Sequence, residues 1–439
     1  MRKTFIFLFA ALYAVFGGIG AGALSPDDIT AQSAVLIDAD TGQILFGKNM
    51  DESMHPASIT KIMTGLLAME SLSPSDIITV SDDAVDIPRD SSHIALTSGE
   101  ELSVEDAMYA LILPSANDAA NALAERIAGS QSAFADMMNE KARAVGAVNT
   151  NFVNAHGLSD ARHLTTALDM ALITKAALET PGFLKYFGTG RYTMPATNKQ
   201  AEERPFSNYQ YMLLPEMWVY NPDIIGGKVG YTKEAGHTMS TAASKHSRTL
   251  ICVVMNDGKD EKFYDTQALM DYGFDDFRLV TVPIPLNEIE ALSAPVMENG
   301  SEIGRAGFSV GVKDISLLIP VGTDVSAVRF TYNVPQSLEQ DKDADASLTI
   351  LLPGDKDNGF PGYTEQLPLS TKITIPDADT AAENGHLPSL NLGPLPYLLL
   401  GLFLIVLAAL LLHLQKRRRI AARRLERRQR VIAERQRRI

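Results

Sequence analysis

The feature that most constrains this chain is residues 395–414, LPYLLLGLFLIVLAALLLHL, which contain no Asp, Glu, Lys or Arg. A helix of this length spans the apolar core of a bilayer and satisfies its own backbone hydrogen bonds there. Lys416-Arg417-Arg418-Arg419 follow at once, and basic flanks stay on the cytoplasmic side. We therefore expect one transmembrane helix over 395–414 and a basic cytoplasmic tail over 415–439.

The other end of the chain has the three regions of a secretory signal peptide. Arg2-Lys3 precede an apolar run over 5–16, and Ala21-Gly22-Ala23 supply small residues for cleavage. We expect a signal peptide over 1–23, cleaved after Ala23. An uncleaved N-terminal anchor is the alternative. The remainder of the chain is then exported and held at the outer face of the cell membrane by its C-terminal helix.

Charge is distributed unevenly along the chain. The formal net charge is −14, but residues 416–439 hold twelve Lys or Arg and two Glu. Without the two ends, residues 24–415 carry 25 basic and 51 acidic residues, a net charge of −26. An acidic body of this kind has no electrostatic footprint for nucleic acid, so we expect no nucleic-acid partner.

Cys252 is the only cysteine and lies in the apolar run LICVVM. An intramolecular disulfide is therefore impossible, and we expect a buried structural thiol.

Hydrophobic patterning divides the exported body into two regions. The first, over 24–280, begins with a β-hairpin at 34–48 and ends with strands over 239–255. Helical periodicity lies between them, at 58–70, 104–112, 118–128, 132–145 and 166–178. We expect an α/β domain whose first and last strands pair in one sheet. Short β-rich runs over 281–378 predict a small all-β domain, and a polar linker follows over 379–394.

Three short motifs in the first region carry nucleophilic and basic side chains. Ser58-Ile59-Thr60-Lys61 places a hydroxyl and an amine one helical turn apart, where a lysine of lowered pKa can activate the serine. Pro114-Ser115-Ala116-Asn117 lies between two helices and offers a hydroxyl for proton transfer and an amide for positioning. Residues 226–232, GGKVGYT, combine Lys228 with glycines that let a strand edge approach a ligand closely.

The ordered trio S-x-x-K, S-x-N and K-x-G resembles the penicillin-recognising serine acyl-transferases. The match is closer to the low-molecular-mass penicillin-binding proteins, the serine D-Ala-D-Ala carboxypeptidases of a peptidase S11-like family. Their pattern is visible over essentially all of 24–280, in PASITKIMTGLLA, LILPSANDAANALAE, TNFVNAHGLSDARHLTTALDMA and GGKVGYTKEAGHT. The resemblance implies a β-lactamase-like fold with a central antiparallel sheet flanked by helices.

The same resemblance implies a role for each motif residue. Ser58 would attack the carbonyl between two D-alanines of a peptidoglycan stem peptide, and Lys61 would accept its proton. Ser115 would relay a proton to the departing D-alanine. The other implied roles concern substrate binding: Asn117 for the substrate backbone, Lys228 and Arg248 for the terminal carboxylate, the backbone N–H groups of Ser58 and Tyr231 as an oxyanion hole, and Gly230 and Thr232 beside them. β-Lactams would be covalent inhibitors, and no cofactor is implied.

Two positions depart from the family pattern: the change at 229 leaves another function open, and the change at 116 is small. Val229 stands where most relatives have Thr, so a hydroxyl that would donate to the substrate carboxylate is missing, and Ala116 replaces the usual Gly. A weakened or inactive homologue that only binds wall peptides is therefore the alternative. A class A β-lactamase is disfavoured because no Glu-x-x-Leu-Asn segment lies between the second and third motifs. A zinc peptidase built on His156, His163 and Asp169 is a further alternative, although both histidines fall within the serine family's pattern.

Overall fold

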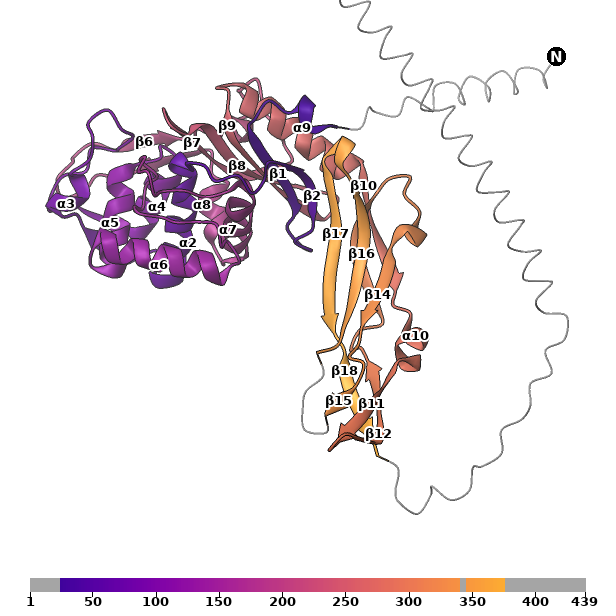
Figure 1. Cartoon of the computed structure of the whole chain (residues 1–439). Coiled ribbons are helices and arrows are strands. Elements are labelled where there is room, and N and C mark those ends of the chain that lie inside the picture. The colour runs from indigo at the N-terminus through magenta and orange to yellow at the C-terminus, as the bar shows by residue number, and fades with distance from the viewer. Residues whose placement is uncertain (1–23, 340–344, 376–439) are drawn as a thin grey trace, which may run out of the picture. The chain divides into compact units, whose positions relative to one another are not determined.

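A computed structural model describes residues 24–339 and 345–375 of the chain (Figure 1). Its centre is a five-stranded antiparallel sheet in the order β2-β1-β9-β8-β7. The strands are β1 Ser33–Asp38, β2 Ile44–Lys48, β7 Ile224–Thr232, β8 Gly236–Lys245 and β9 Arg248–Asp257. β1 pairs with β2 and, along its whole length, with β9. The predicted hairpin and the predicted pairing of first and last strands are both confirmed.

Successive side chains of a strand point to opposite faces of the sheet. Both faces are covered here, so the side chains of one strand enter two different cores. In β1, Val35 and Ile37 pack into the larger helical core, whereas Leu36 faces the opposite core. The larger core is built from several helices (Figure 1): α2 Lys61–Ser71, α4 Val104–Ile112, α5 Asn117–Ala128, α6 Gln131–Ala144, α7 Ala167–Glu179 and α8 Phe183–Phe187. α9 Glu261–Asp275 covers the other face.

Cys252 belongs to the second core and is fully buried. Burial raises the pKa of its thiol far above the usual value. The thiol is therefore structural, as the sequence predicts.

The five predicted helices agree closely with the structure apart from one helix start, whereas α8, α9 and two further short helices of the described residues were not predicted. The predicted helix over 58–70 begins as the 3₁₀ turn η2 Ala57–Thr60, and the α-helix starts only at Lys61. Ala57 has φ +50°, which is incompatible with a regular helix start. α9 is absent from the sequence-based assignment because its apolar residues are interrupted by Asp, Gln and Gly.

Short elements connect the larger ones: η1 Pro26–Asp28, β3 Ile77–Thr79, α3 Asp82–Val85, β4 Glu101–Ser103, β5 Arg191–Met194, β6 Arg204–Ser207 and η3 Tyr211–Leu213. β3 pairs with β4, and β5 pairs with β6. These two-stranded sheets flank the segments 80–100 and 208–218, which contribute residues to the functional site.

The segment after α9 consists mainly of strands arranged in small sheets of orders β10-β13, β15-β11-β12-β18 and β14-β16-β17. The elements are β10 Phe277–Pro283, α10 Leu286–Ala291, β11 Ser293–Glu298, β12 Ser301–Ser309, β13 Asp314–Pro320, η4 Val325–Ala327, β14 Arg329–Asn333, β15 Leu338–Glu339, β16 Ser347–Asp355, η5 Lys356–Asn358, β17 Phe360–Pro368 and β18 Ser370–Thr374. The predicted boundary at residue 280 falls inside β10, and the division into two domains stays a prediction.

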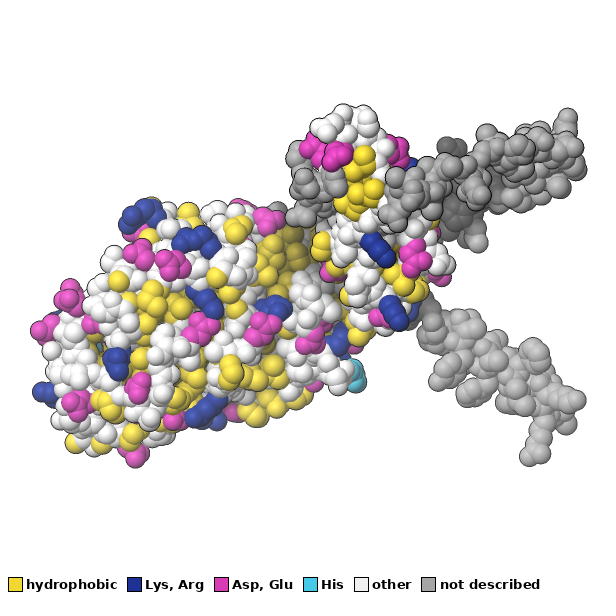
Figure 2. Space-filling model, turned by 90° about the horizontal axis from the view of Figure 1, so that it is seen from below, with side chains coloured by type: hydrophobic (Ala, Val, Ile, Leu, Met, Phe, Trp, Pro, Cys, Tyr) yellow, Lys and Arg dark blue, Asp and Glu magenta, His cyan; other side chains and the backbone are white. Residues whose placement is uncertain are grey.

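On the face shown in Figure 2, basic and acidic side chains are interspersed with small apolar patches. Within residues 24–339 and 345–375, no helix is both long enough and apolar enough to cross a bilayer. The predicted signal peptide over 1–23, linker over 379–394, transmembrane helix over 395–414 and tail over 415–439 lie outside the described residues.

Candidate active site

Ser58 and Lys61 face each other at the start of α2. The Lys61 ammonium donates to Ser58 Oγ over 3.1 Å, to Asn117 Oδ1 over 2.7 Å and to the His156 carbonyl over 2.7 Å. Three acceptors hold the amine in one orientation. The predicted nucleophile and base are therefore brought together, and the Asn117 oxygen is used to position Lys61.

Lys61 is completely buried. Burial lowers the pKa of its amine well below the usual value, and the positive charge of Lys228 lowers it further, while the Asp118 carboxylate opposes the shift. A neutral amine beside a serine hydroxyl can accept its proton. The site thus supplies an activated nucleophile.

Ser115 and Lys228 form a second pair. The Lys228 ammonium donates to Ser115 Oγ over 2.9 Å and to the carbonyl of Val229 over 2.9 Å. Burial lowers the pKa of Lys228 to about 7. Ser115 has φ +64°, a strained backbone conformation for a non-glycine residue. Because Lys228 donates to the Ser115 oxygen, the Ser115 hydroxyl proton is available to another acceptor.

Two glycines let the backbone close around Ser58. A Cβ on Gly230 would lie 2.7 Å from the backbone nitrogen of Ser58. A Cβ on Gly157, which has φ +88°, would lie 1.9 Å from the Ala57 carbonyl oxygen. β7 therefore runs directly against the Ser58 turn, and Tyr231 follows at the same edge. This contact is the close backbone approach that the GGKVGYT motif predicts.

The histidines of the zinc alternative have structural roles. His163 Nδ1 accepts from the backbone N–H of Val153 over 3.0 Å, so its Nε2 donates to Thr60 Oγ1 over 2.9 Å. Burial lowers the pKa of His156 to about 3 and of His163 to about 4, so both rings are neutral.

Asp169 accepts from the backbone N–H of Asn149 and from the hydroxyl of Thr150, each over 2.7 Å. Within residues 24–339 and 345–375, no group of three or more His, Cys, Asp or Glu is arranged to hold a metal ion. Both His163 nitrogens are engaged, so the donor set does not fit zinc.

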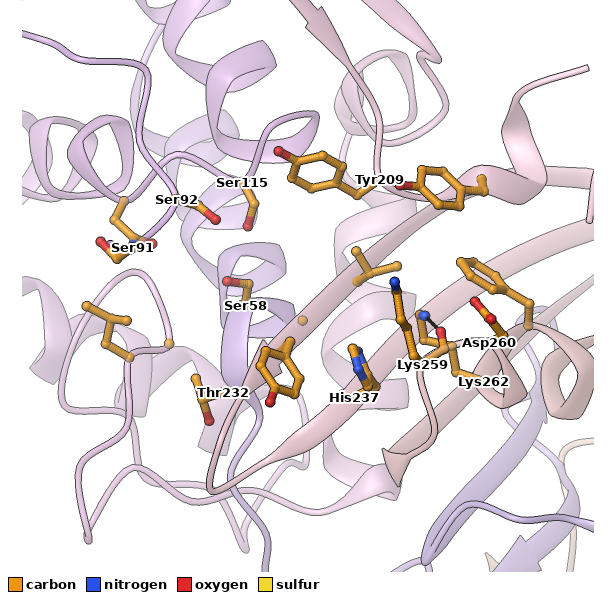
Figure 3. Close-up of a pocket in the computed structure, with 18 of the residues that line it drawn as sticks. Ser58, Ser91, Ser92, Ser115, Tyr209, Thr232, His237, Lys259, Asp260 and Lys262 are labelled. Atoms are coloured by element: carbon orange, nitrogen blue, oxygen red, sulfur yellow. Dashed lines mark hydrogen bonds between the residues drawn. The ribbon is translucent and has the colours of Figure 1, made fainter. Parts of the chain in front are cut away.

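Ser58 opens into a cleft of about 810 Å³ (Figure 3). Several lining residues were predicted from the motifs: Ser58, Ser115, Asn117, Gly230, Tyr231 and Thr232. Thr232 accepts from the Ser159 hydroxyl over 2.9 Å. In Figure 3, Ser91 and Ser92 lie on one side of Ser58, and Lys259, Asp260 and Lys262 lie on the other.

Sequence reasoning missed Lys262, which lines the cleft and is almost buried. Its ammonium lies 4.1 Å from the centroid of the Phe263 ring, and burial lowers its pKa to about 8. The sequence signal that could have identified Lys262 is the charged run over 259–262, which follows the buried strand β9. Lys262 therefore lines the cleft as a largely buried cation, and its Nζ donates to the backbone carbonyl of Lys259.

Arg248 is a correction, since the structure does not bring it to the cleft. Its guanidinium donates to the carbonyls of Gly273 over 2.7 Å and of Phe274 over 3.1 Å, near the end of α9. Arg248 is the first residue of β9 and pairs with Lys245 of β8. Lys228 of β7 lies further along the sheet, because it pairs with Ser240 of β8, and Ser240 in turn pairs with Val253 of β9. The expected carboxylate contact therefore fails because Arg248 lies at the opposite end of β9.

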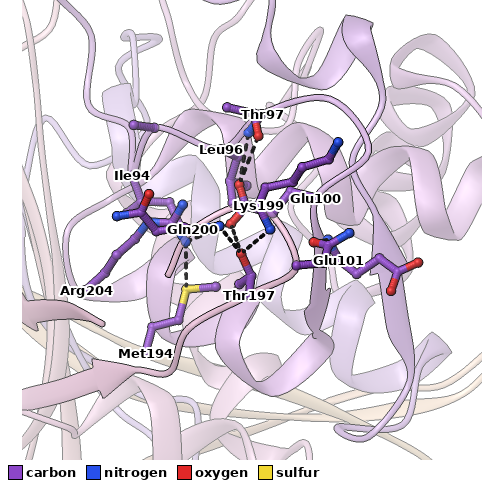
Figure 4. Close-up of polar contacts among 12 residues, drawn as sticks. Ile94, Leu96, Thr97, Glu100, Glu101, Met194, Thr197, Lys199, Gln200 and Arg204 are labelled. Atoms are coloured by element: carbon purple, nitrogen blue, oxygen red, sulfur yellow. Dashed lines mark hydrogen bonds and ion pairs between the residues drawn. The ribbon is translucent and has the colours of Figure 1, made fainter. Parts of the chain in front are cut away.

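A buried ion pair supports the cleft loops (Figure 4). Glu100 is fully buried and bonds to Arg204 of β6 over 2.8 Å and to the Thr197 hydroxyl over 2.8 Å. Burial alone would raise the pKa of Glu100, but these hydrogen bonds bring it below its usual value. The pair fastens the loop before β4 to the β5-β6 hairpin.

Comparisons with known proteins agree with this geometry. The family model for D-alanyl-D-alanine carboxypeptidase, peptidase S11, matches residues 21–259. The D-alanyl-D-alanine carboxypeptidase DacF of Bacillus subtilis is 35% identical over 254 residues, 56% of this chain and 63% of that protein. DacC of Escherichia coli is 32% identical over 294 residues, which are 64% of this chain and 69% of that protein.

Solved structures show the same fold. Penicillin binding protein 5 from Haemophilus influenzae has a TM-score of 0.60 at 26% identity, with 79% of this chain and 98% of that chain covered. The D-alanyl-D-alanine carboxypeptidase of Mycobacterium tuberculosis has a TM-score of 0.52 at 27% identity, with 58% and 94% covered. Since the matched family region contains all three motifs and the geometry joins them in one cleft, this chain belongs to the D-alanyl-D-alanine carboxypeptidase family of serine peptidases, peptidase S11.

Proposed function

We propose that this protein removes the terminal D-alanine from peptidoglycan stem peptides ending in D-Ala-D-Ala, and so limits cross-linking of the cell wall. Ser58 Oγ attacks the carbonyl of the penultimate D-alanine and forms an acyl-enzyme. Water then hydrolyses the ester. β-Lactams acylate the same serine.

The observation that carries this proposal is the 3.1 Å contact between Lys61 Nζ and Ser58 Oγ at a buried amine of lowered pKa. Lys61 takes the hydroxyl proton as the carbonyl is attacked. Ser115 passes a proton to the departing nitrogen while its oxygen accepts from Lys228. The backbone N–H groups of Ser58 and Tyr231 receive the oxyanion, since Gly230 brings their two segments together.

Lys262 is the residue that we assign to the free carboxylate of the substrate, in place of Arg248. It lines the same cleft as Val229, and a charge-assisted hydrogen bond to a carboxylate is favoured where water is scarce. Lys228 adds positive charge nearby. The charge of Lys262 thereby compensates in part for the hydrogen bond that a threonine hydroxyl at position 229 would donate to the substrate carboxylate.

The first test is the intact mass of the full-length protein after incubation with benzylpenicillin, beside a Ser58→Ala control. We expect one adduct per chain in the wild-type protein and none in the variant. Release of free D-alanine from diacetyl-L-Lys-D-Ala-D-Ala then measures turnover. No adduct on a folded wild-type protein would overturn the acyl-enzyme mechanism.

A protein that only binds wall peptides remains the second candidate, because Val229 lacks the hydroxyl. It predicts peptide binding without release of D-alanine at any pH. The D-alanine assay therefore distinguishes the two functions.

We also propose that the protein is a single-pass protein of the bacterial cell membrane, with its catalytic region outside the cell. The support is the sequence alone, namely the signal-peptide pattern over 1–23 and the charge-free run over 395–414 with its basic flank. Truncation after residue 390 should move the protein from the membrane fraction to the soluble fraction. Retention of that truncated protein in the membrane would contradict the assignment.

A further inference from the structure

We propose that the cleft has an aromatic subsite for the side chain of the departing amino acid, and that the enzyme therefore prefers a bulky apolar D-residue such as D-phenylalanine over D-alanine. This inference rests on the proposed function, because it concerns the substrate of the same Ser58 site. It extends that function from one leaving group to a class of them.

The position of the cations defines the side of the cleft on which the departing residue lies. Among the described residues, the lysines that line the cleft are Lys259 and Lys262. Both lie on the side of Ser58 opposite Ser91 and Ser92 (Figure 3). Asp260 lies with them and offsets part of their charge. The C-terminal carboxylate is the only charge that every such substrate carries, so it is drawn to this side.

Aromatic residues form the wall beside those cations. Tyr211 and Phe263 stack with their ring centroids 5.7 Å apart, and Trp218 meets both rings edge-to-face. Met217 completes the wall. Lys262 Nζ lies 4.1 Å from the Phe263 centroid, so the cation and the aromatic wall adjoin. A ligand that uses both needs a carboxylate and an apolar side chain on one residue.

Trp218 is the exposed member of the wall. It is the only tryptophan in the chain, and its exposed fraction is 58% although it contacts the rings of Tyr211 and Phe263. The loop that carries it is fixed by backbone hydrogen bonds from Met217 to Leu214 and from Asn221 to Met212. The Asn221 side chain also donates to Gln267 of α9 over 2.8 Å. The indole is therefore held in place at the edge of the cleft, and covering it removes apolar surface from water.

The methyl group of D-alanine presents too little apolar surface to cover this wall. A sugar ring can stack on an indole, but it brings no carboxylate to Lys262. A D-amino acid with a phenyl or similar side chain satisfies both features. Its release involves the same bonds as release of D-alanine: the Ser58 ester forms, the amide bond breaks, and the departing nitrogen takes a proton through Ser115.

The experiment compares diacetyl-L-Lys-D-Ala-D-Ala with diacetyl-L-Lys-D-Ala-D-Phe as substrates of the full-length protein. The measured quantity is the ratio of kcat/KM for the D-Phe peptide to kcat/KM for the D-Ala peptide. We expect a wild-type ratio above one and a ratio about tenfold lower in Trp218→Ala, for the loss of one aromatic contact. Tyr220→Ala is the matched control, because Tyr220 is an exposed aromatic residue of the same loop that does not line the cleft. It should leave the ratio unchanged.

A second readout does not require turnover. Since Trp218 is the only tryptophan, its fluorescence in the Ser58→Ala protein reports ligand contact directly. The D-Phe peptide should shift the emission at concentrations at which the D-Ala peptide does not.

The outcomes separate this inference from the proposed function. Release of D-alanine with a ratio well below one, or an equal ratio in wild type and Trp218→Ala, overturns the aromatic subsite and leaves the carboxypeptidase function intact. If neither peptide is cleaved, the proposed function fails. In that case the fluorescence titration alone tests the aromatic subsite. Equal emission changes with the D-Phe and D-Ala peptides would overturn it.

Discussion

The amine of Lys61 lies 3.1 Å from the hydroxyl oxygen of Ser58, and this amine is completely buried. The positive charge of Lys228 lowers the pKa of Lys61 beyond the effect of burial. The nucleophile therefore depends on two lysines, one that accepts its proton and one whose charge adds to the effect of burial on the pKa of the first.

The coupling between the two lysines predicts a pH effect. A neutral Lys61 is the reactive form, so the acylation rate by benzylpenicillin should rise with pH as Lys61 loses its proton. Lys228→Met removes a charge that lowers the Lys61 pKa, so this rise should move to higher pH. Stopped-flow acylation rates across pH measure the midpoint. Lys259→Met removes a different cleft cation and should leave the midpoint in place; an equal shift in both variants would contradict the coupling.

Val229→Thr restores the hydroxyl that the third motif lacks. One added hydrogen bond to the substrate carboxylate contributes about 0.5–1.5 kcal/mol, which corresponds to an increase in kcat/KM of about two- to tenfold. D-Alanine release from the diacetyl tripeptide measures this gain. Val229→Ala removes the methyl groups of Val229 without adding a hydroxyl and should show no increase in kcat/KM. A gain in that variant would attribute the effect to loss of a methyl group rather than to the new hydrogen bond.

Gly157→Ala should disable Ser58 without changing any motif residue. The added Cβ would lie 1.9 Å from the Ala57 carbonyl oxygen, so the turn that carries Ser58 must move. Displacement of a reacting group by about 1 Å costs on the order of 100-fold in rate. Benzylpenicillin acylation measures the loss, and circular dichroism checks that the variant is folded. Gly129→Ala is the control, because Gly129 also has positive φ but its Cβ would meet nothing within 4 Å.

Arg248 and Lys262 should differ in what they affect. Arg248→Gln removes hydrogen bonds to carbonyls of α9 and should destabilise the fold by roughly 1–3 kcal/mol while the KM for the tripeptide stays the same. Lys262→Gln should raise KM several-fold through loss of the carboxylate contact. Denaturant unfolding and steady-state kinetics on both variants give the comparison. If KM rises in Arg248→Gln and not in Lys262→Gln, Arg248 rather than Lys262 binds the substrate carboxylate.

The Glu100–Arg204 pair predicts a stability effect with a defined pH dependence. Arg204→Met leaves a buried carboxylate without its partner, at a cost of about 3–5 kcal/mol. The folded-state pKa of Glu100 is lowered, so the pair's contribution is present above the unfolded-state pKa and is lost as pH falls through the folded-state value. The difference in unfolding free energy between wild type and variant should therefore shrink in acid. A double variant that also carries Glu100→Gln should recover part of the lost stability at pH 7.

Local patterns predicted the parts of the site that short motifs encode. Ser58 and Lys61 meet because they are three positions apart near a helix start, and Ser115 lies in a loop because proline and serine interrupt two helices. Lys262 was missed because its place depends on how α9 packs against β8 and β9, which is a tertiary relationship that a local pattern does not encode. Arg248 was misplaced for a related reason: the apolar run identifies β9 as a strand but does not tell which of its ends lies near the cleft.

The pairing of β1 with β9 also bears on how the chain can fold as it is made. Ser33 pairs with Met255 and Asp38 with Leu250, so the centre of the sheet joins residues from opposite ends of the family region. Such non-local contacts slow folding, because a long loop must close before they form. Until residues 248–257 emerge, β1 has an open edge that can pair with other chains. A nascent chain that stalls before residue 248 is therefore exposed to aggregation, and the completed strand β9 removes that hazard.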